Sequence, residues 1–202
     1  MYKVFIDHKP VIFTENRLVP NNSCVLDASQ IENLRDDIAD QLKEVTIDAP
    51  LYIACNDTKV EFERIFKPFK KLEAAGGLVR RKEKFLIIKR KGLWDIPKGG
   101  INKGEKAKHA AIREIAEECG IDGHEIVDKL CTTYHLMKWK GRSAIKRTKW
   151  YMMRYSGSKE TTPQLKEGIT KAKWVNSDDL LAIRGNTYGS INDVLDAWFN
   201  RP

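Results

Sequence analysis

Three glutamates lie close together near the middle of the chain, at positions 114, 117 and 118. The apolar periodicity from about Lys106 to Cys119 predicts a helix, and the i, i+3, i+4 spacing then gathers the three carboxylates on one side of it. They also lie toward the helix C-terminus, where the macrodipole adds partial negative charge. Hard divalent cations such as Mg²⁺ or Mn²⁺ relieve this repulsion and prefer oxygen ligands. The pattern predicts a metal site, with a solvated acidic face as the alternative.

The helix has a second, apolar side that is expected to pack on the rest of the protein. It is formed by Ala111, Ile112, Ile115, Ala116 and Cys119. The Cys119 thiol is expected to be a small buried group and not a nucleophile.

A glycine-containing approach, Pro97-Lys98-Gly99-Gly100, precedes the helix. Glycine lets the backbone come close to a metal or a phosphate, and the Gly99 carbonyl is a possible ligand. Lys98 places a positive charge where phosphate oxygens are expected. Carboxylates and a lysine together indicate a site for a metal-bound phosphate chain.

Residues 99–121 resemble the Nudix box, G-x5-E-x7-R-E-U-x-E-E-x-G-U, where U is aliphatic. Every defined position is filled, by Gly99, Glu105, Arg113, Glu114, Ile115, Glu117, Glu118, Gly120 and Ile121. The likeness extends over roughly residues 72–200, and residues 1–70 lie outside it. Asn102 departs from the many members that carry an acidic residue there.

The resemblance implies a Nudix hydrolase, which cleaves a pyrophosphate bond in a nucleoside diphosphate linked to another moiety with the help of Mg²⁺ or Mn²⁺. It implies an α/β/α sandwich around a mixed sheet. Glu114, Glu117, Glu118 and the Gly99 carbonyl then correspond to metal ligands, and Arg113 orients Glu114.

Two further glutamates receive roles through the same resemblance. Glu105 corresponds to the residue that braces the loop against the helix; a simple capping interaction with Asn102 is the alternative. Glu167, in the loop before a later strand, is the candidate for an additional ligand or base. Arg113 has an alternative too, which is an ordinary i, i+4 pair with Glu117.

The substrate is expected to be a nucleotide or polyphosphate. The Pro-Lys-Gly approach is similar to that of diadenosine and diphosphoinositol polyphosphate hydrolases. Residues 129–173 contain 12 Lys or Arg but only two acidic residues, which suits a polyanion as well as a solvated surface. Candidate substrate-binding residues are Lys98, Trp94, Lys138 and Arg147, although Trp94 is also explained as a packed aromatic residue.

Two rival functions remain open. One is removal of pyrophosphate from the 5′ end of RNA, and the sequence favours hydrolysis of a small molecule over it. The other is a non-catalytic ligand sensor on the same fold. A sensor is expected to lose box carboxylates, and this chain keeps them all.

The elements that must position this site fall into two predicted domains. Residues 71–202 form the Nudix domain, with a hairpin of 78–81 and 85–90, strands at 130–138, 147–155 and 171–175, and helices at 178–183 and 190–199, the last capped by Ser190. Residues 1–70 form a small α/β domain, with strands at 2–7, 10–15 and 51–55, a helix from Ser29 to about Lys43 and another after Asn56 or Asp57. Its role is left open among a structural one, substrate covering and formation of a homodimer.

Composition bounds the class of protein. The 202 residues carry a net charge of +8 and 42% hydrophobic residues, enough for a packed core. No apolar run approaches the roughly 18 residues of a membrane span. Four scattered cysteines without a CxxC pair argue against a disulfide framework and predict a reducing, cytoplasmic location.

Overall fold

The computed structural model describes the whole chain except residues 7, 16–17, 22, 28–49 and 202. The helix expected from Ser29 to Lys43 lies outside the described residues. Contacts divide the chain into two compact units, Met1–Leu72 with Tyr134–Lys146, and Glu73–Thr133 with Arg147–Pro202. The domain boundary at residue 70 stays a prediction.

The larger unit is built on a sheet in the order β11-β6-β5-β10-β9. Short strands β7 and β8 pair with β6 and β5 respectively. The strands are β5 Lys70–Arg81, β6 Lys84–Arg90, β7 Leu93–Asp95, β8 Lys98–Gly100, β9 Glu125–Trp139, β10 Arg142–Arg154 and β11 Ile169–Val175. Strand β8 falls in the segment expected to be a loop, because its pairing with β5 is a long-range contact that local spacing does not reveal.

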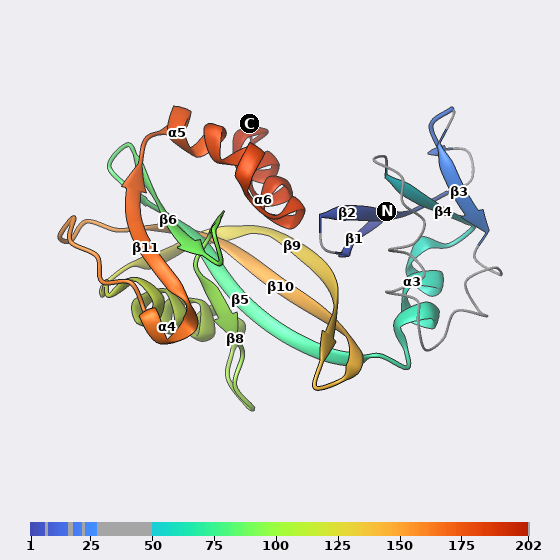
Figure 1. The fold of residues 1–202 in the computed structure, drawn as a ribbon, viewed down its shortest axis with the longest axis horizontal. Helices are drawn as coiled ribbons and strands as arrows, with labels where there is room; N and C mark the ends of the chain where they lie inside the picture. The colour runs from blue at the N-terminus through green and yellow to red at the C-terminus, as the bar shows by residue number, and fades with distance from the viewer. Residues whose placement is uncertain (7, 16–17, 22, 28–49, 202) are drawn as a thin grey trace. The chain divides into compact units, whose positions relative to one another are not determined.

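Helices cover both faces of this sheet (Figure 1). On one face α4 (Ala107–Cys119) packs on Leu86 and Ile88; on the other, α5 (Ser177–Ala182) and α6 (Gly189–Phe199) pack on Phe85 and Ile87. The alternation follows from the two-residue period of a strand. Short 3₁₀ turns, η3 (Leu165–Glu167) and η4 (Ile183–Asn186), precede β11 and follow α5. The expected α/β class, with helices on a mixed sheet, is confirmed.

Residues with positive φ angles end strand β6 and helix α4. Lys91 and Gly92 have positive φ angles of 52° and 83°, so the chain turns tightly and β7 folds back along β6. Gly120 ends α4 with φ 65°, and its amide donates to the Ala116 carbonyl at 2.9 Å. The expected Ser190 cap is wrong, since Tyr188 occupies the N-cap of α6 without a side-chain bond.

The smaller unit contains β1 (Tyr2–Ile6), β2 (Lys9–Glu15), β3 (Cys24–Asp27), β4 (Leu51–Cys55) and α3 (Thr58–Phe66). β1 pairs antiparallel with β2, whereas β4 runs parallel to both β2 and β3. Asp57 caps α3 by accepting from the amides of Lys59 and Val60, as one of the two expected caps. Phe62 stacks on Tyr2 with ring centroids 4.5 Å apart. Strand β3 was not expected from the sequence.

None of the helices in the described part of the chain is long and apolar enough to cross a membrane.

Candidate active site

Helix α4 buries two of its three glutamates. Glu114 and Glu118, one turn apart, are 7% and 0% exposed, whereas the Glu117 side chain is 46% exposed. The expected apolar side needs correction, because Ile112 and Ala116 are only half-buried. The stripe that faces the sheet instead includes both buried carboxylates, and burying a carboxylate requires compensation from nearby donors.

Glu114 lies directly against the main chain of Gly99. A Cβ atom at Gly99 would overlap the Glu114 carboxylate, while a Cβ at Gly100 would meet nothing within 4 Å. The first glycine is therefore required by the close approach of a strand and a helix. This cradle places the Gly99 backbone beside a carboxylate, as the resemblance to the Nudix box implied.

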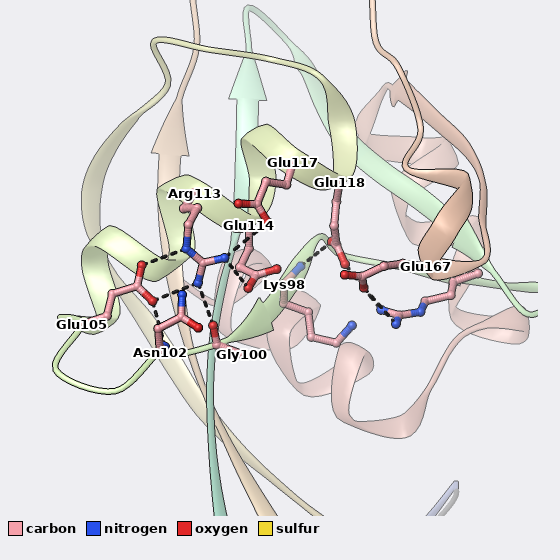
Figure 2. Close-up of polar contacts among 10 residues, drawn as sticks. Lys98, Gly100, Asn102, Glu105, Arg113, Glu114, Glu117, Glu118 and Glu167 are labelled. Atoms are coloured by element: carbon pink, nitrogen blue, oxygen red, sulfur yellow. Dashed lines mark hydrogen bonds and ion pairs between the residues drawn. The ribbon is translucent and has the colours of Figure 1, made fainter.

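Arg113 connects the loop to the helix with every arm of its guanidinium group (Figure 2). It donates to both oxygens of Glu105 at 2.9 Å, to Glu114 Oε1 at 2.7 Å and to the Gly100 carbonyl at 2.8 Å. A longer contact of 3.3 Å reaches Glu117. The planar fork suits such shared recognition of carboxylates. Arg113 thus fixes the orientation of Glu114 and is more than an i, i+4 partner of Glu117.

Glu105 acts in this structure as a brace. Besides its two bonds to Arg113, it accepts from the Asn102 amide at 2.9 Å, so the capping alternative and the bracing role coexist. The hydrogen bond from Arg113 is the main reason that the pKa of Glu105 falls to about 2, and the Asn102 amide adds to the shift. Glu105 is consequently ionised at any working pH, and the pKa of Arg113 is raised in turn.

Strand β8 holds Glu118. The Lys98 amide donates to its Oε2 at 2.8 Å. The Lys98 ammonium points elsewhere: it pairs with buried Asp95 at 2.6 Å, and Asp95 also accepts from the Ile96 amide. Sequence reasoning placed this lysine on phosphate oxygens and missed its acidic partner.

Arg90, at the end of β6, is the second residue that the sequence did not reveal. Its guanidinium lies between two carboxylates, 3.4 Å from Glu118 Oε1 and 3.2 Å from Glu167 Oε2. No local signal marks it, because its partners are 28 and 77 residues away. Glu167 itself lies on η3, just before β11, where its loop was expected.

Burial dominates the electrostatics of both inner glutamates. It raises the pKa of Glu118 to about 7, against the opposing effects of Lys98 and Arg90. Burial also raises the pKa of Glu114, and Arg113 opposes that shift. Carboxylates that are costly to ionise without a cation are a chemical reason for a cation to bind.

The oxygen donors at this site are of the kind that bind a divalent cation, but their side chains do not converge on one point. Across the residues that the structure describes, no three His, Cys, Asp or Glu side chains converge on one point. Oxygen donors and the Gly99 cradle nonetheless match what Mg²⁺ or Mn²⁺ binds. Arg90 supplies positive charge between Glu118 and Glu167, so a metal ion bound there competes with its contacts, whereas Arg113 orients Glu114.

The remaining candidate residues lie in different surroundings. Trp94 packs against the core beneath α5 and α6. Arg147 is paired with Glu73 at 3.0 Å, so a carboxylate already balances its charge. Lys138 belongs to the segment Tyr134–Lys146 of the smaller unit. The structure brings together the box residues, Lys98 and Glu167, and Arg147 contacts Glu73, whose carbonyl accepts from the Ile101 amide.

The fold and this site define a class of protein. The NUDIX domain model matches residues 70–193, and the chain belongs to that family. Nudix hydrolases generally use divalent metals.

Curated proteins with similar sequences include RNA pyrophosphohydrolases. An RNA pyrophosphohydrolase of Wolbachia pipientis subsp. Culex pipiens is 33% identical over 104 residues, 44% of this chain and 62% of that protein. An RNA pyrophosphohydrolase of Pelagibacter ubique is 30% identical over 122 residues, 51% of this chain and 74% of that protein. The chain thus spans about three fifths of the length of the first of these relatives.

Solved structures show the same fold. A C. elegans Ap4A hydrolase aligns with a TM-score of 0.51 and 24% identity, covering 63% of this chain and 95% of the hydrolase. A MutT NUDIX hydrolase from Burkholderia pseudomallei aligns with a TM-score of 0.50 and 22% identity, covering 62% and 97%. At these identities the likeness concerns the fold alone.

Proposed function

We propose that this protein is a divalent-metal-dependent pyrophosphohydrolase. The observation that carries the proposal is the hydrogen-bonded set built by Arg113, which holds Glu105, Glu114 and the Gly100 carbonyl within 2.9 Å. A sensor that binds a nucleotide without hydrolysing it has no need for this carboxylate set. The non-catalytic alternative is therefore disfavoured.

Each residue of the set has a task in this reaction. Glu114, Glu117, Glu118 and the Gly99 carbonyl are the proposed ligands of Mg²⁺ or Mn²⁺, and Glu167 is proposed as an additional ligand or as the base. When bound, these ions would polarise phosphorus and lower the pKa of the attacking water. An exposed carboxylate beside the proposed metal ligands accepts the proton of the attacking water. Glu167 suits that role, because its side chain is 41% exposed and lies on a short turn.

RNA carrying a 5′-triphosphate is the substrate proposed first. The curated relatives at 30–34% identity are RNA pyrophosphohydrolases. A polyanion also agrees with the net charge of +8. This preference reverses the order expected from the sequence, in which small molecules came before RNA.

A dinucleoside polyphosphate is the second candidate. The Pro97-Lys98-Gly99 approach favours it through its likeness to that of dinucleoside polyphosphate hydrolases, and the main-chain amide of Lys98 contacts Glu118. To reach phosphate, the Lys98 ammonium has to exchange its contact with Asp95. Breaking the Lys98–Asp95 ion pair costs free energy. An RNA substrate whose phosphates are bound by other lysines or arginines does not require it.

A substrate panel tests the proposal. Purified protein is incubated with Mg²⁺ or Mn²⁺ and either 5′-triphosphorylated RNA, Ap4A or ADP-ribose, and released pyrophosphate, phosphate or nucleotide is measured. RNA is expected to be cleaved with the highest kcat/KM. If every compound stays intact with both metals, the proposed activity is wrong.

Three wider proposals accompany this function. A reducing, cytoplasmic location agrees with the four free cysteines, Cys24, Cys55, Cys119 and Cys131. The division into a domain of residues 1–70 and a Nudix domain of 71–202 is retained as a proposal, as is a homodimer.

A further inference from the structure

A tryptophan contacts two lysine side chains on the sheet face opposite α4. The ammonium groups of Lys89 and Lys173 lie 5.4 Å and 4.7 Å from the centre of the Trp94 ring. Lys89 pairs directly with Trp94 between β6 and β7, and with Lys171 between β6 and β11. Paired residues share a face and alternate residues along a strand do too, so all four side chains lie on one surface. We call these four residues the lysine–indole patch.

The patch has positive charge without a matching carboxylate. Within the described part of the chain, Lys89, Lys171 and Lys173 form no ion pair. Lys171 and Lys173 are exposed, and Lys89 and Trp94 are half-buried, with Trp94 packing on one side against the core under α5 and α6. Lys89 and Lys171 are directly opposite one another, and like charges in such cross-strand pairs destabilise a sheet. A ligand that supplies negative charge removes that cost.

The patch adjoins the candidate active site along the chain. Lys89 is followed by Arg90, whose guanidinium contacts Glu118 and Glu167. Trp94 is followed by Asp95, which holds the Lys98 ammonium. Strands β6 and β7 therefore carry the patch on one face and contacts to the site on the other.

We propose that the lysine–indole patch binds the single-stranded nucleotides that follow the 5′ end of an RNA substrate. The inference rests on the proposed function, because it extends that substrate beyond its terminal phosphates. Aromatic rings that stack bases, flanked by lysines that contact phosphates, are the general means of binding single strands. Lys171 and Lys173, two positions apart along a strand, are separated by about 6.8 Å, a spacing that suits contacts to successive phosphates.

Binding of an RNA that cannot be hydrolysed isolates this surface from catalysis. A 12-nucleotide single-stranded RNA with a 5′-hydroxyl and a 3′-fluorescent label is titrated with the full-length protein, and anisotropy is followed at several salt concentrations. The test protein carries Lys171→Gln and Lys173→Gln. The control carries Lys84→Gln, on the opposite face of β6, and Lys159→Gln, in an exposed loop.

The test variant is expected to bind about ten-fold more weakly than the parent at 100 mM salt, while the control stays within about two-fold. Each lost phosphate contact removes about 0.7 from the slope of log K against log salt, so the slope should fall by about 1.4. Equal losses in test and control proteins overturn the proposal. Thermal unfolding of both variants shows whether they fold.

Two comparisons identify the partner. Trp94→Leu should weaken binding of single-stranded RNA more than binding of a polyglutamate peptide of equal charge, because only bases stack on the ring. Duplex RNA should bind more weakly than the single strand. Equal effects of Trp94→Leu on RNA and peptide would assign the patch to polyanions in general and overturn the RNA assignment.

The same experiment separates this inference from the proposed function. If 5′-triphosphorylated RNA is not cleaved but the 5′-hydroxyl RNA binds through the patch, the hydrolase proposal fails and the patch stands. If the RNA is cleaved and the Lys171 and Lys173 variant binds it like the control, the patch proposal is wrong.

Discussion

The main-chain amide of Lys98 donates a hydrogen bond to Oε2 of Glu118 at 2.8 Å, across 20 residues of sequence. It ties strand β8 to the last turn of helix α4. The carboxylate that receives it is fully buried. One hydrogen bond thus joins the glycine approach to the acidic helix, while burial of the Glu118 side chain raises its pKa to about 7.

Replacing Glu118 by Gln should abolish most of the activity without unfolding the protein. The amide oxygen of Gln still accepts the Lys98 amide, but the negative charge is lost. We expect kcat to fall by about 10²–10³-fold, the scale seen when a key electrostatic group is removed. Glu125→Gln, at an exposed residue paired with Arg154, is the control. A Glu118→Gln variant with parental kcat contradicts the assigned role.

The stability of the metal-free protein should decrease as the pH rises. The pKa of Glu118 is raised from 4.5 to about 7, so the folded state holds that proton more tightly than the unfolded state. Stabilisation by the bound proton is complete below pH 4.5 and is lost as the pH rises through 7, an effect of at most about 3 kcal/mol.

Urea unfolding in EDTA across this range measures the effect. Glu118→Gln should lack the decline, so its free energy of unfolding should approach or exceed that of the parent near pH 8. Parallel pH curves for the two proteins would show that Glu118 does not carry the shifted pKa.

Alanine at two neighbouring glycines should have very different effects. A Cβ at Gly99 overlaps the Glu114 carboxylate, so Gly99→Ala must displace it. Displacement of a catalytic group by about 1 Å costs on the order of 10²-fold in rate. Gly100→Ala meets nothing within 4 Å and should retain most of the activity. Steady-state kinetics of both variants measure the difference. Similar activities would show that the close approach of Gly99 to Glu114 is not needed for catalysis.

Lysine should not replace Arg113. The guanidinium reaches Glu105, Glu114 and the Gly100 carbonyl at once, and a lysine ammonium lacks that fork. We expect Arg113→Lys to lose about 1–3 kcal/mol of stability, measured by chemical denaturation, together with most of the activity. Arg80→Lys, whose partner Glu83 is 86% exposed, should change stability by less than about 0.5 kcal/mol. Equal losses at the two positions would contradict this reasoning.

Removing Arg90 should strengthen metal binding. Its guanidinium supplies the positive charge between Glu118 and Glu167 in the metal-free protein. Arg90→Gln leaves both carboxylates without that partner, so a divalent ion no longer competes with it. Calorimetric titration with Mn²⁺ should give a several-fold lower Kd than for the parent, with Arg154→Gln as the control. A higher Kd would mean that Arg90 prepares the site instead.

The pattern of residues 99–121 was sufficient to predict the helix and the family. A helix has a fixed rise and twist, so the spacing of Glu114, Glu117 and Glu118 places them close together whatever surrounds them. The β-hairpin around residues 82–84 was also predictable, because a turn and the alternation of apolar and polar residues along a strand are local properties. The NUDIX match confirms the family.

Packing decided which glutamates are buried. The sequence grouped Glu114, Glu117 and Glu118 as one acidic face, but only the seating of α4 on the sheet separates the buried pair from exposed Glu117. Strand β8 likewise exists because β5 offers it hydrogen-bonding partners.

The contacts made by Arg90, Asp95 and Lys171 required the tertiary structure. Arg90 meets Glu167 across 77 residues, and Lys171 meets Lys89 only through the register of β11 on β6. Local spacing fixes neighbours along a helix or a turn, whereas strand register depends on side chains from distant parts of the chain that pack together. The amino-acid sequence thus determined the chemistry that this protein carries, and the fold determined the partners that surround it.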